Sequence, residues 1–315
     1  MSATVMTVTG SMDADFLGFT LPHEHIYINL VREYRGDGLL NDAQLMHAEL
    51  ARFQEVGGRS LVDLTTRGAG TEDDLTRDAV AIRAAAEASG LNIVIGTGAY
   101  RDPYLDRHWF DRHDVGQLAE QMVKEVEVGI GDSGIRAGII GEVGSDLGHI
   151  SALEERGFRA AARAHATTGL TISTHAARWP GVGLRQLSLL EDEGVDPSRI
   201  VIGHCDTVPD SADRLEIARR GAYVELDNIR GESEYETELR VRWVLELLDA
   251  GYADRILLSQ DVCLRSHLRV RGGPGYVFVA ETFLPRLRDA GLTDEQIDEL
   301  TVGNPRRALT GEVAL

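Results

Sequence analysis

Short runs of β-branched and aliphatic residues alternate along the chain with longer stretches rich in alanine, arginine and glutamate. The short runs have the length and composition of buried strands, whereas the longer stretches space their apolar residues as amphipathic helices do. The eight strand-like runs begin at Phe16, Ser60, Asn92, Ala137, Leu170, Ile200, Ala222 and Arg255. Helix-like stretches that end on glycine lie between them, as at residues 74–90, 153–169, 183–194 and 235–251.

This alternation predicts an α/β fold with a single (β/α)8 TIM barrel over residues 1–315, since no proline- or serine-rich linker divides the chain. A doubly wound parallel sheet is the alternative. It would usually have fewer strands and a glycine-rich first turn, whereas the first strand here runs into "LPHEHIY". Near the other end, "GNPRRAL" predicts a helix capped by Asn304.

Side chains that can bind a metal ion stand at the ends of five predicted strands. His23 and His25 end the first strand, and because strand side chains alternate, both face one side and Glu24 the other. The remaining candidates end the fourth, fifth, sixth and eighth strands and are Glu142, His175, His204 and Asp261. In a barrel these strand ends form the functional face. Each residue alone would be a hydrogen-bonded core residue or a helix cap, but six together indicate a metal site.

The number of candidate ligands predicts two metal ions. Six exceed the three protein ligands of a tetrahedral zinc ion with an open position, but they suit two ions that share a bridge. Four imidazoles and two carboxylates favour zinc, with manganese, cobalt and iron as alternatives.

These motifs, together with "SHLRVRGGPGYVFVAETFLPRLRDAGLT" after the eighth strand, resemble the phosphotriesterase family of the amidohydrolase superfamily. The resemblance runs from about Gly18 to Leu309, and the chain looks most similar to the branch of phosphotriesterase homology proteins. It implies that His23, His25 and Asp261 bind the more buried metal ion. It also implies that His175 and His204 bind the more exposed one, with Glu142 and a hydroxide as bridges, and that the protein is a homodimer, as family members often are.

The chain departs from the family pattern at two positions. Many members use a carboxylated lysine as the bridge, but the only lysine here, Lys124, lies in a helix-like stretch, so Glu142 would take that place. True phosphotriesterases have a histidine after the aspartate of the seventh strand, whereas Asn228 follows Asp227 here. An amide cannot shuttle a proton as an imidazole does, which argues against phosphotriesterase activity.

The ligand cluster indicates hydrolysis by a metal-bridging hydroxide, with Asp261 as the catalytic residue that takes a proton and passes it to the leaving group. Asp206, two residues after His204, is a candidate to orient an imidazole, or to cap the helix that follows. The leading interpretation is a metal-dependent hydrolase of a small carboxylic ester or lactone. The alternatives are an organophosphate triesterase, an N-acyl amidohydrolase and a binding protein without catalysis.

The loops after the strands should shape the substrate pocket. Candidate pocket residues are Tyr100, Arg101, Arg178, Trp179, Arg230, Arg265, His267, Arg269 and Arg271. In a chain with a formal net charge of −19, arginines at the barrel mouth indicate an anionic group on the substrate, unless they pair with surface acids.

Charge and composition argue against several partners and locations. A net charge of −19 disfavours nucleic acids and anionic membranes, leaving a small-molecule substrate as the expected partner. No apolar run reaches the roughly 20 residues needed to span a bilayer. Two cysteines, Cys205 and Cys263, are too few for a disulfide framework, and the N-terminus lacks a signal-peptide pattern, so we expect a cytoplasmic protein.

Overall fold

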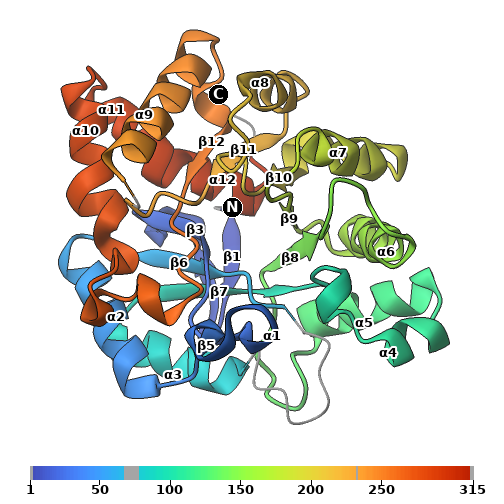
Figure 1. The fold of residues 1–315 in the computed structure, drawn as a ribbon. Helices are drawn as coiled ribbons and strands as arrows, with labels where there is room; N and C mark the ends of the chain where they lie inside the picture. Colours follow the sequence, from blue (N-terminus) through green and yellow to red (C-terminus); the bar gives the residue numbers. More distant parts are fainter. Residues whose placement is uncertain (1–2, 67–77, 232, 313–315) are drawn as a thin grey trace.

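The computed structural model describes residues 3–66, 78–231 and 233–312. Its centre is a parallel sheet of eight strands that neighbour one another in sequence order, with helices arranged around it (Figure 1). The strands are β3 (Thr20–Glu24), β6 (Ser60–Asp63), β7 (Asn92–Thr97), β8 (Ile139–Gly144), β9 (Ile172–His175), β10 (Ile200–Ile202), β11 (Tyr223–Leu226) and β12 (Ile256–Leu258). Each lies within one of the eight predicted runs, and the predicted TIM barrel is confirmed.

The first and last strands meet through hydrogen bonds just beyond the end of β12. The His23 amide donates to Ser259 Oγ at 3.0 Å, and the Ser259 hydroxyl donates to the His23 carbonyl at 2.8 Å. The Asp261 amide also donates to the His23 carbonyl, at 3.2 Å. These bonds join β3 to the segment after β12, so two residues with candidate ligand side chains also help to close the barrel.

Helices follow the strands and bury their apolar faces against the sheet. The longer ones are α2 (Ala43–Glu55), α3 (Ala79–Ser89), α5 (Val115–Glu127), α6 (Ala152–Thr168), α7 (Val182–Asp192), α8 (Ser211–Arg219) and α9 (Glu234–Asp249). The shorter ones are α1 (Val31–Tyr34), α4 (Arg107–Arg112), α10 (Leu284–Asp289), α11 (Asp294–Asp298) and α12 (Asn304–Thr310). The first four residues of the helix-like stretch 74–90 lie outside the described residues.

Local signals in the sequence explain where several of these helices begin and end. Ser151 and Glu154 form a reciprocal capping box at the start of α6, which supplies partners for backbone amides that have none inside the helix. Gly90 and Gly169 end α3 and α6 at φ values of 71° and 72°, a left-handed conformation that glycine adopts without a Cβ clash.

Two antiparallel hairpins accompany the barrel. Strands β1 (Thr4–Thr7) and β2 (Gly10–Asp13) form the first, and β4 (Ile28–Asn29) and β5 (Leu39–Leu40) form the second, in the loop after β3. No helix in the described part of the chain is long and apolar enough to cross a membrane. Both cysteines are free.

Asn304 is not the helix cap that the sequence predicts. The helix runs continuously from a π-helical turn at Glu299–Gly303 into α12, and Gly303 already has helical dihedral angles. The buried side-chain amide of Asn304 instead donates to the backbone carbonyls of Ala253 and Ile256, at 2.8 and 2.7 Å. It thereby ties α12 to the start of β12, a long-range contact that no local pattern shows.

Replacing Asn304 by alanine should lower the free energy of unfolding by about 2 to 4 kcal/mol, because two buried carbonyls would lose their donor. Urea unfolding of the variant measures the loss. The matched control is Asn41→Ala, at an exposed position, which should change stability by less than about 0.5 kcal/mol. Equal stabilities of the two variants would contradict this role for Asn304.

Candidate metal centre and active-site cavity

All six residues predicted as metal ligands meet at the carboxyl end of the barrel. His23 lies in β3 with His25 just beyond it, Glu142 lies in β8, and His175 is the last residue of β9. His204 and Asp261 follow β10 and β12 closely. Their ligand atoms form two compact groups, one of His23, His25 and Asp261 and the other of Glu142, His175 and His204. Within each group the atoms lie within 4.8 Å of one another.

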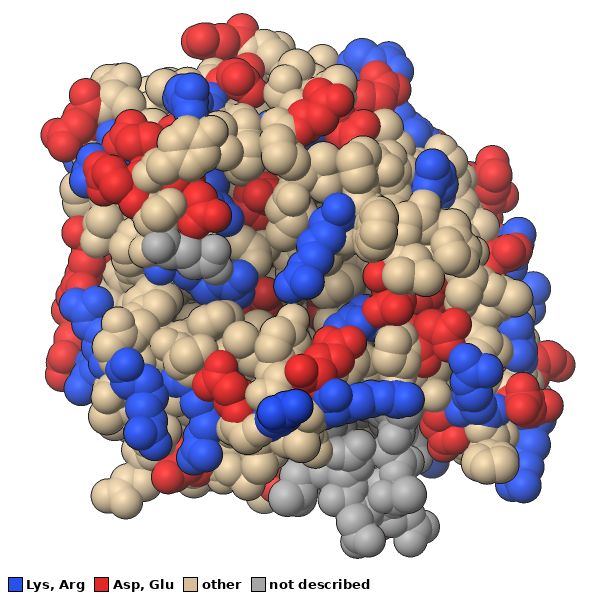
Figure 2. Space-filling view, in the orientation of Figure 1, with Lys and Arg blue, Asp and Glu red and all other residues tan. Residues whose placement is uncertain are grey.

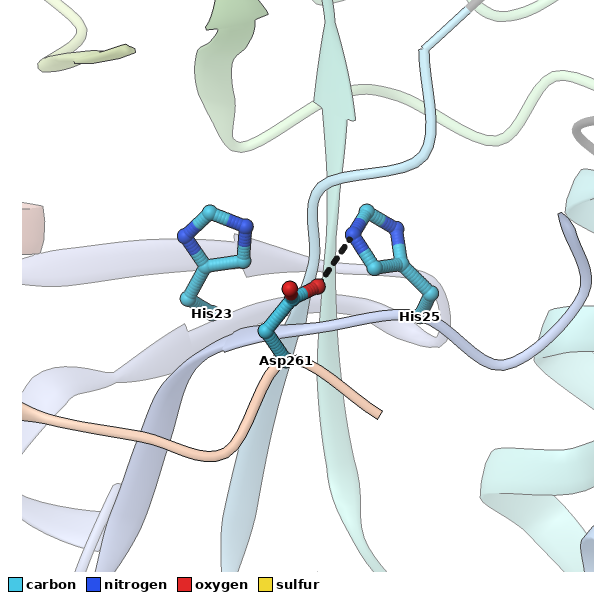
Figure 3. A group of neighbouring side chains, drawn as sticks. All are labelled: His23, His25 and Asp261. Carbon is cyan, nitrogen blue, oxygen red and sulfur yellow. Dashed lines mark ion pairs between the residues drawn. The ribbon is translucent and has the colours of Figure 1, made fainter. Parts of the chain in front are cut away.

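The first group comes from the two strands that close the barrel. His25 Nε2 lies 3.2 Å from Asp261 Oδ1, and the Asp261 carboxylate lies between the rings of His23 and His25 (Figure 3). Because His23 and His25 are two residues apart, both rings project to the same side, as the alternation of a strand requires.

One oxygen of Glu142, a member of the second group, also lies close to His23 of the first group. Its Oε1 atom lies 2.5 Å from His175 Nδ1, 3.0 Å from His204 Nε2 and 3.6 Å from His23 Nε2. His23 belongs to the first group and the other two histidines to the second. A carboxylate in this place is suited to bridge two cations.

The chemistry of these atoms fits metal ions. His23 Nε2 is buried and has no hydrogen-bond partner, which would be costly for a nitrogen that did not bind a ligand. His175 Nδ1 and His204 Nε2 lie only 2.7 Å apart with the Glu142 carboxylate beside both. Such a concentration of buried nitrogen and oxygen ligand atoms is typical of a site for divalent cations such as zinc.

The pKa values of Glu142 and His175 suit a cation site, whereas, despite their burial, the Asp227 carboxylate raises the pKa values of His23 and His204. Burial alone would raise the pKa of Glu142, but His175, His204 and His23 hold it well below its usual range, so the side chain is a carboxylate. Burial lowers the pKa of His175 to about 4, which keeps its imidazole neutral. Carboxylate and neutral imidazole are the forms that bind metal ions.

Two carboxylates, Glu225 in β11 and Asp227 just after it, contact the imidazoles on the side away from the cavity. Glu225 Oε2 lies 3.0 Å from His23 Nδ1, and Asp227 Oδ1 lies 2.7 Å from His204 Nδ1. A carboxylate on Nδ1 fixes the ring so that Nε2 faces the site. Neither residue is assigned this role from the sequence, although two acids at alternate positions of "VELDN", at the end of a predicted strand, are a signal for it.

Asp206 has neither of the roles proposed from the sequence. Its carboxylate accepts hydrogen bonds from the Asn228 amide at 2.9 Å, the Asn228 side chain at 3.1 Å and Arg240 Nε at 2.7 Å. It therefore orients an asparagine rather than an imidazole, and Asp210 caps α8. The Asn228 side chain also donates to Asp227, from Nδ2 at 2.7 Å, so two carboxylates hold it in place.

Glu24, between His23 and His25, faces the other way and holds the segment that carries Asp261. Its two carboxylate oxygens accept hydrogen bonds from the backbone amides of Gln260 and Val262, each at 2.8 Å. Burial raises the pKa of Glu24 to about 7, although these hydrogen bonds lower it. The two bonded amides flank Asp261 on either side along the chain.

Backbone strain is concentrated at the same face. Only four described residues other than glycine have clearly positive φ angles, namely Arg35, Arg178, His204 and Asp261. The last three line the cavity that contains the candidate ligands. Side chains in this conformation are uncommon outside glycine, and such strain is often found at functional sites.

The cavity over the ligands has a volume of ≈ 600 Å³. Of the candidate pocket residues, Tyr100, Arg101, Arg178, Trp179, Arg230 and His267 line it. Arg265, Arg269 and Arg271 lie in the same loop as His267 but are not among the described residues that line it, and Arg269 pairs with Glu281 at 3.0 Å. Glu33 and Tyr34 from the loop after β3, and Leu147 from the loop after β8, also line the cavity and were not foreseen.

Two of the arginines that line the cavity form ion pairs with carboxylates. Arg101 pairs with both Glu33 and Asp146. Arg230 donates to the Asp261 carbonyl at 2.7 Å and lies 3.2 Å from Asp261 Oδ2. These arginines therefore organise the cavity wall and the position of Asp261.

The sequence model of the phosphotriesterase family matches residues 3–309. The chain belongs to this family. It is 38% identical to the phosphotriesterase homology protein of Escherichia coli (strain K12), over 93% of this chain and 98% of that protein. The crystal structure of the Escherichia coli protein, complexed with phosphate in the active site, matches with a TM-score of 0.88 and 36% identity. That match covers 94% of this chain and 99% of the other.

More distant relatives in the phosphotriesterase family carry names that state an activity. The N-acetyltaurine hydrolase of Dictyostelium discoideum is 29% identical, over 97% of each chain. The crystal structure of a lactonase from Listeria monocytogenes matches with a TM-score of 0.87 and 26% identity, and covers 98% of this chain and all of that one. The family predicted from the strand-end motifs is confirmed, and the chain is a metal-dependent hydrolase.

In this phosphotriesterase-family chain, Glu24→Gln should lower the free energy of unfolding by about 1 to 3 kcal/mol. Whichever way the new side-chain amide turns, its NH2 group faces one of the two backbone N–H groups whose hydrogen bonds Glu24 accepts. The variant should also bind zinc more weakly, because the Asp261 segment loses a support. Thermal unfolding and zinc titration measure the two effects, with Glu87→Gln, an exposed position in α3, as control. Wild-type behaviour of Glu24→Gln in both would exclude this support.

Proposed function

We propose that the protein uses two divalent metal ions, zinc in the first place, to hydrolyse a small carboxylic ester or lactone. The observation that carries the proposal is the position of Glu142 Oε1, which borders His23 of one ligand group and His175 and His204 of the other. His23, His25 and Asp261 would hold one ion, His175 and His204 the second, and Glu142 both. When bound, two such ions supply a water of lowered pKa and polarise the substrate carbonyl oxygen.

Asp261 is the residue proposed to move the proton. Its carboxylate is held by His25 on Oδ1 and by Arg230 on Oδ2, and it lines the cavity from which a substrate would approach. In this place it would accept a proton from the attacking water and pass it to the leaving oxygen or nitrogen. The hydrogen bonds that the two flanking amides donate to Glu24 keep Asp261 in its strained conformation.

The relatives support cleavage of an acyl bond. One is a lactonase, and several are N-acetyltaurine hydrolases, which makes an N-acyl amidohydrolase the second candidate. The phosphotriester alternative is less well supported, because Asn228 is held by Asp206 and Asp227 where a relay would need a mobile proton. The phosphate in the Escherichia coli relative supports a site that accepts an oxyanion.

Metal content tests the metal centre directly. After incubation with zinc and removal of the excess, elemental analysis should find two ions per wild-type chain. Glu142→Gln should bind zinc at least about tenfold more weakly, because a neutral amide cannot bridge two cations as a carboxylate does. Glu127→Gln, at an exposed position of α5, is the matched control and should keep both ions. A wild-type protein that retains no metal after supplementation would refute the proposal.

Turnover on a substrate panel tests the activity. The panel contains δ-valerolactone, phenyl acetate, an N-acetyl amino acid and a trialkyl or aryl dialkyl phosphate, and we expect the lactone or the ester to give the highest kcat/KM. Asp261→Asn should reduce kcat on the best substrate by about 10² to 10⁴, while elemental analysis still finds bound zinc. Asp132→Asn, at an exposed position, serves as control. Near-normal turnover by Asp261→Asn would refute its role, and preference for the phosphotriester would refute the substrate class.

A further inference from the structure

In the described part of the chain, Arg178 differs from the other arginines of the cavity in having no carboxylate partner. Arg101 pairs with two carboxylates, and Arg230 pairs with Asp261. The Arg178 guanidinium donates from Nη2 to the Tyr34 hydroxyl, at 3.5 Å. Among the described residues no acid lies within ion-pair distance of it, in a chain with 51 acidic residues.

Ion pairs between arginines and acids are common elsewhere on this molecule. Figure 2 shows acidic and basic side chains interspersed over one face, and many of the arginines pair with neighbouring acids, as Arg159 does with Glu155 and Arg286 with Glu238. A guanidinium in the cavity that stays without such a partner keeps its donors available for a ligand.

The backbone at Arg178 is strained and held in place. Arg178 has a φ of 68°, and its amide donates to Thr207 Oγ1 at 2.8 Å. The Thr207 hydroxyl in turn donates to the His204 carbonyl at 2.7 Å. The turn after β9 is therefore fixed to the loop that carries His204, and the start of the Arg178 side chain is fixed relative to the candidate metal ligands.

The charges around the cavity favour an anion at this position. The lining carboxylates near the mouth, Glu33 and Asp146, both pair with Arg101. With two divalent ions on the ligands, the lining groups together would carry an excess of positive charge. A guanidinium presents parallel N–H donors that match a carboxylate or a sulfonate.

We propose that Arg178 binds an oxyanion group, carboxylate or sulfonate, that the substrate carries away from the bond to be cleaved. This inference rests on the proposed hydrolysis and names its substrate class, an acyl compound with an anionic end. Beside Arg178, Trp179 and Leu147 line the cavity with 45% and 47% of their surface exposed. They form an apolar wall along which the carbon chain between the two ends of the substrate lies.

Matched ester pairs test the proposal with the zinc-loaded protein. Mono-4-nitrophenyl glutarate carries an anionic end, and 4-nitrophenyl valerate is its neutral counterpart. Wild type should prefer the anionic ester, and Arg178→Asn should lower the ratio of the two kcat/KM values by roughly ten- to hundredfold, mainly through KM. Asparagine tolerates a positive φ, so the backbone at this position is kept.

Arg35→Asn is the matched control, since Arg35 is exposed, has a φ of 51° and does not line the cavity. This control should keep the wild-type ratio. A wild type that prefers valerate, or an unchanged ratio in Arg178→Asn, would overturn the proposal. If neither ester is turned over, the proposed hydrolysis fails instead, and binding then decides the role of Arg178.

Calorimetric titration with propane-1-sulfonate and with butyrate gives that second readout. A sulfonate is a poor metal ligand, so its binding reports the arginine rather than the zinc. Wild type should bind at least one of the two anions, Arg178→Asn should bind that anion roughly tenfold more weakly or not at all, and Arg35→Asn should bind it as wild type does. The anion whose affinity falls more in Arg178→Asn shows whether the substrate carries a sulfonate or a carboxylate. If wild type and Arg178→Asn bind both anions equally well, the proposal is overturned.

Discussion

A single carboxylate oxygen, Oε1 of Glu142, connects the two halves of the candidate metal centre. It lies within reach of imidazoles from β3, β9 and β10, which are brought together only where the strands converge at the mouth of the barrel. A carboxylate buried in this way is costly unless positive charge faces it. In the protein the surrounding imidazoles hold its pKa low, and bound cations would do so more strongly. The other residues of the site are arranged so that imidazoles, and cations when bound, face this carboxylate.

The surrounding shell explains how the ligand atoms stay in place. Glu225 and Asp227 fix the rings of His23 and His204 from behind, and Glu24 holds the amides on both sides of Asp261. Such outer contacts set the orientation of ligands and so their affinity for metal ions. They also secure backbone conformations with positive φ that would otherwise relax. The hydrogen bonds that hold the candidate ligands and the strained backbone conformations therefore occur at the same strand ends.

The arginines at the mouth of the cavity differ in whether a carboxylate of the protein pairs with them. Arg101 and Arg230 are bound to carboxylates of the protein, so they shape the wall and hold Asp261. Arg178 remains without a carboxylate partner among the described residues and lies on a strained turn next to the candidate ligand His175. The barrel itself is common to the phosphotriesterase family, whereas the side chains of these loops set what the cavity accepts.

The sequence by itself determined the barrel and the six ligand candidates. Strand runs and helix stretches carry distinct hydrophobic periods, and the strand ends of a barrel share one face, so His23 and Asp261 could be placed together although 238 positions separate them in the chain. The tertiary structure decided what lies around that set. Asp206 bonds Asn228 rather than an imidazole, and Asn304 donates to the start of β12 instead of capping its own helix. Hydrogen-bond partners of buried polar groups depend on which side chains meet across the fold, and local sequence patterns do not encode those meetings.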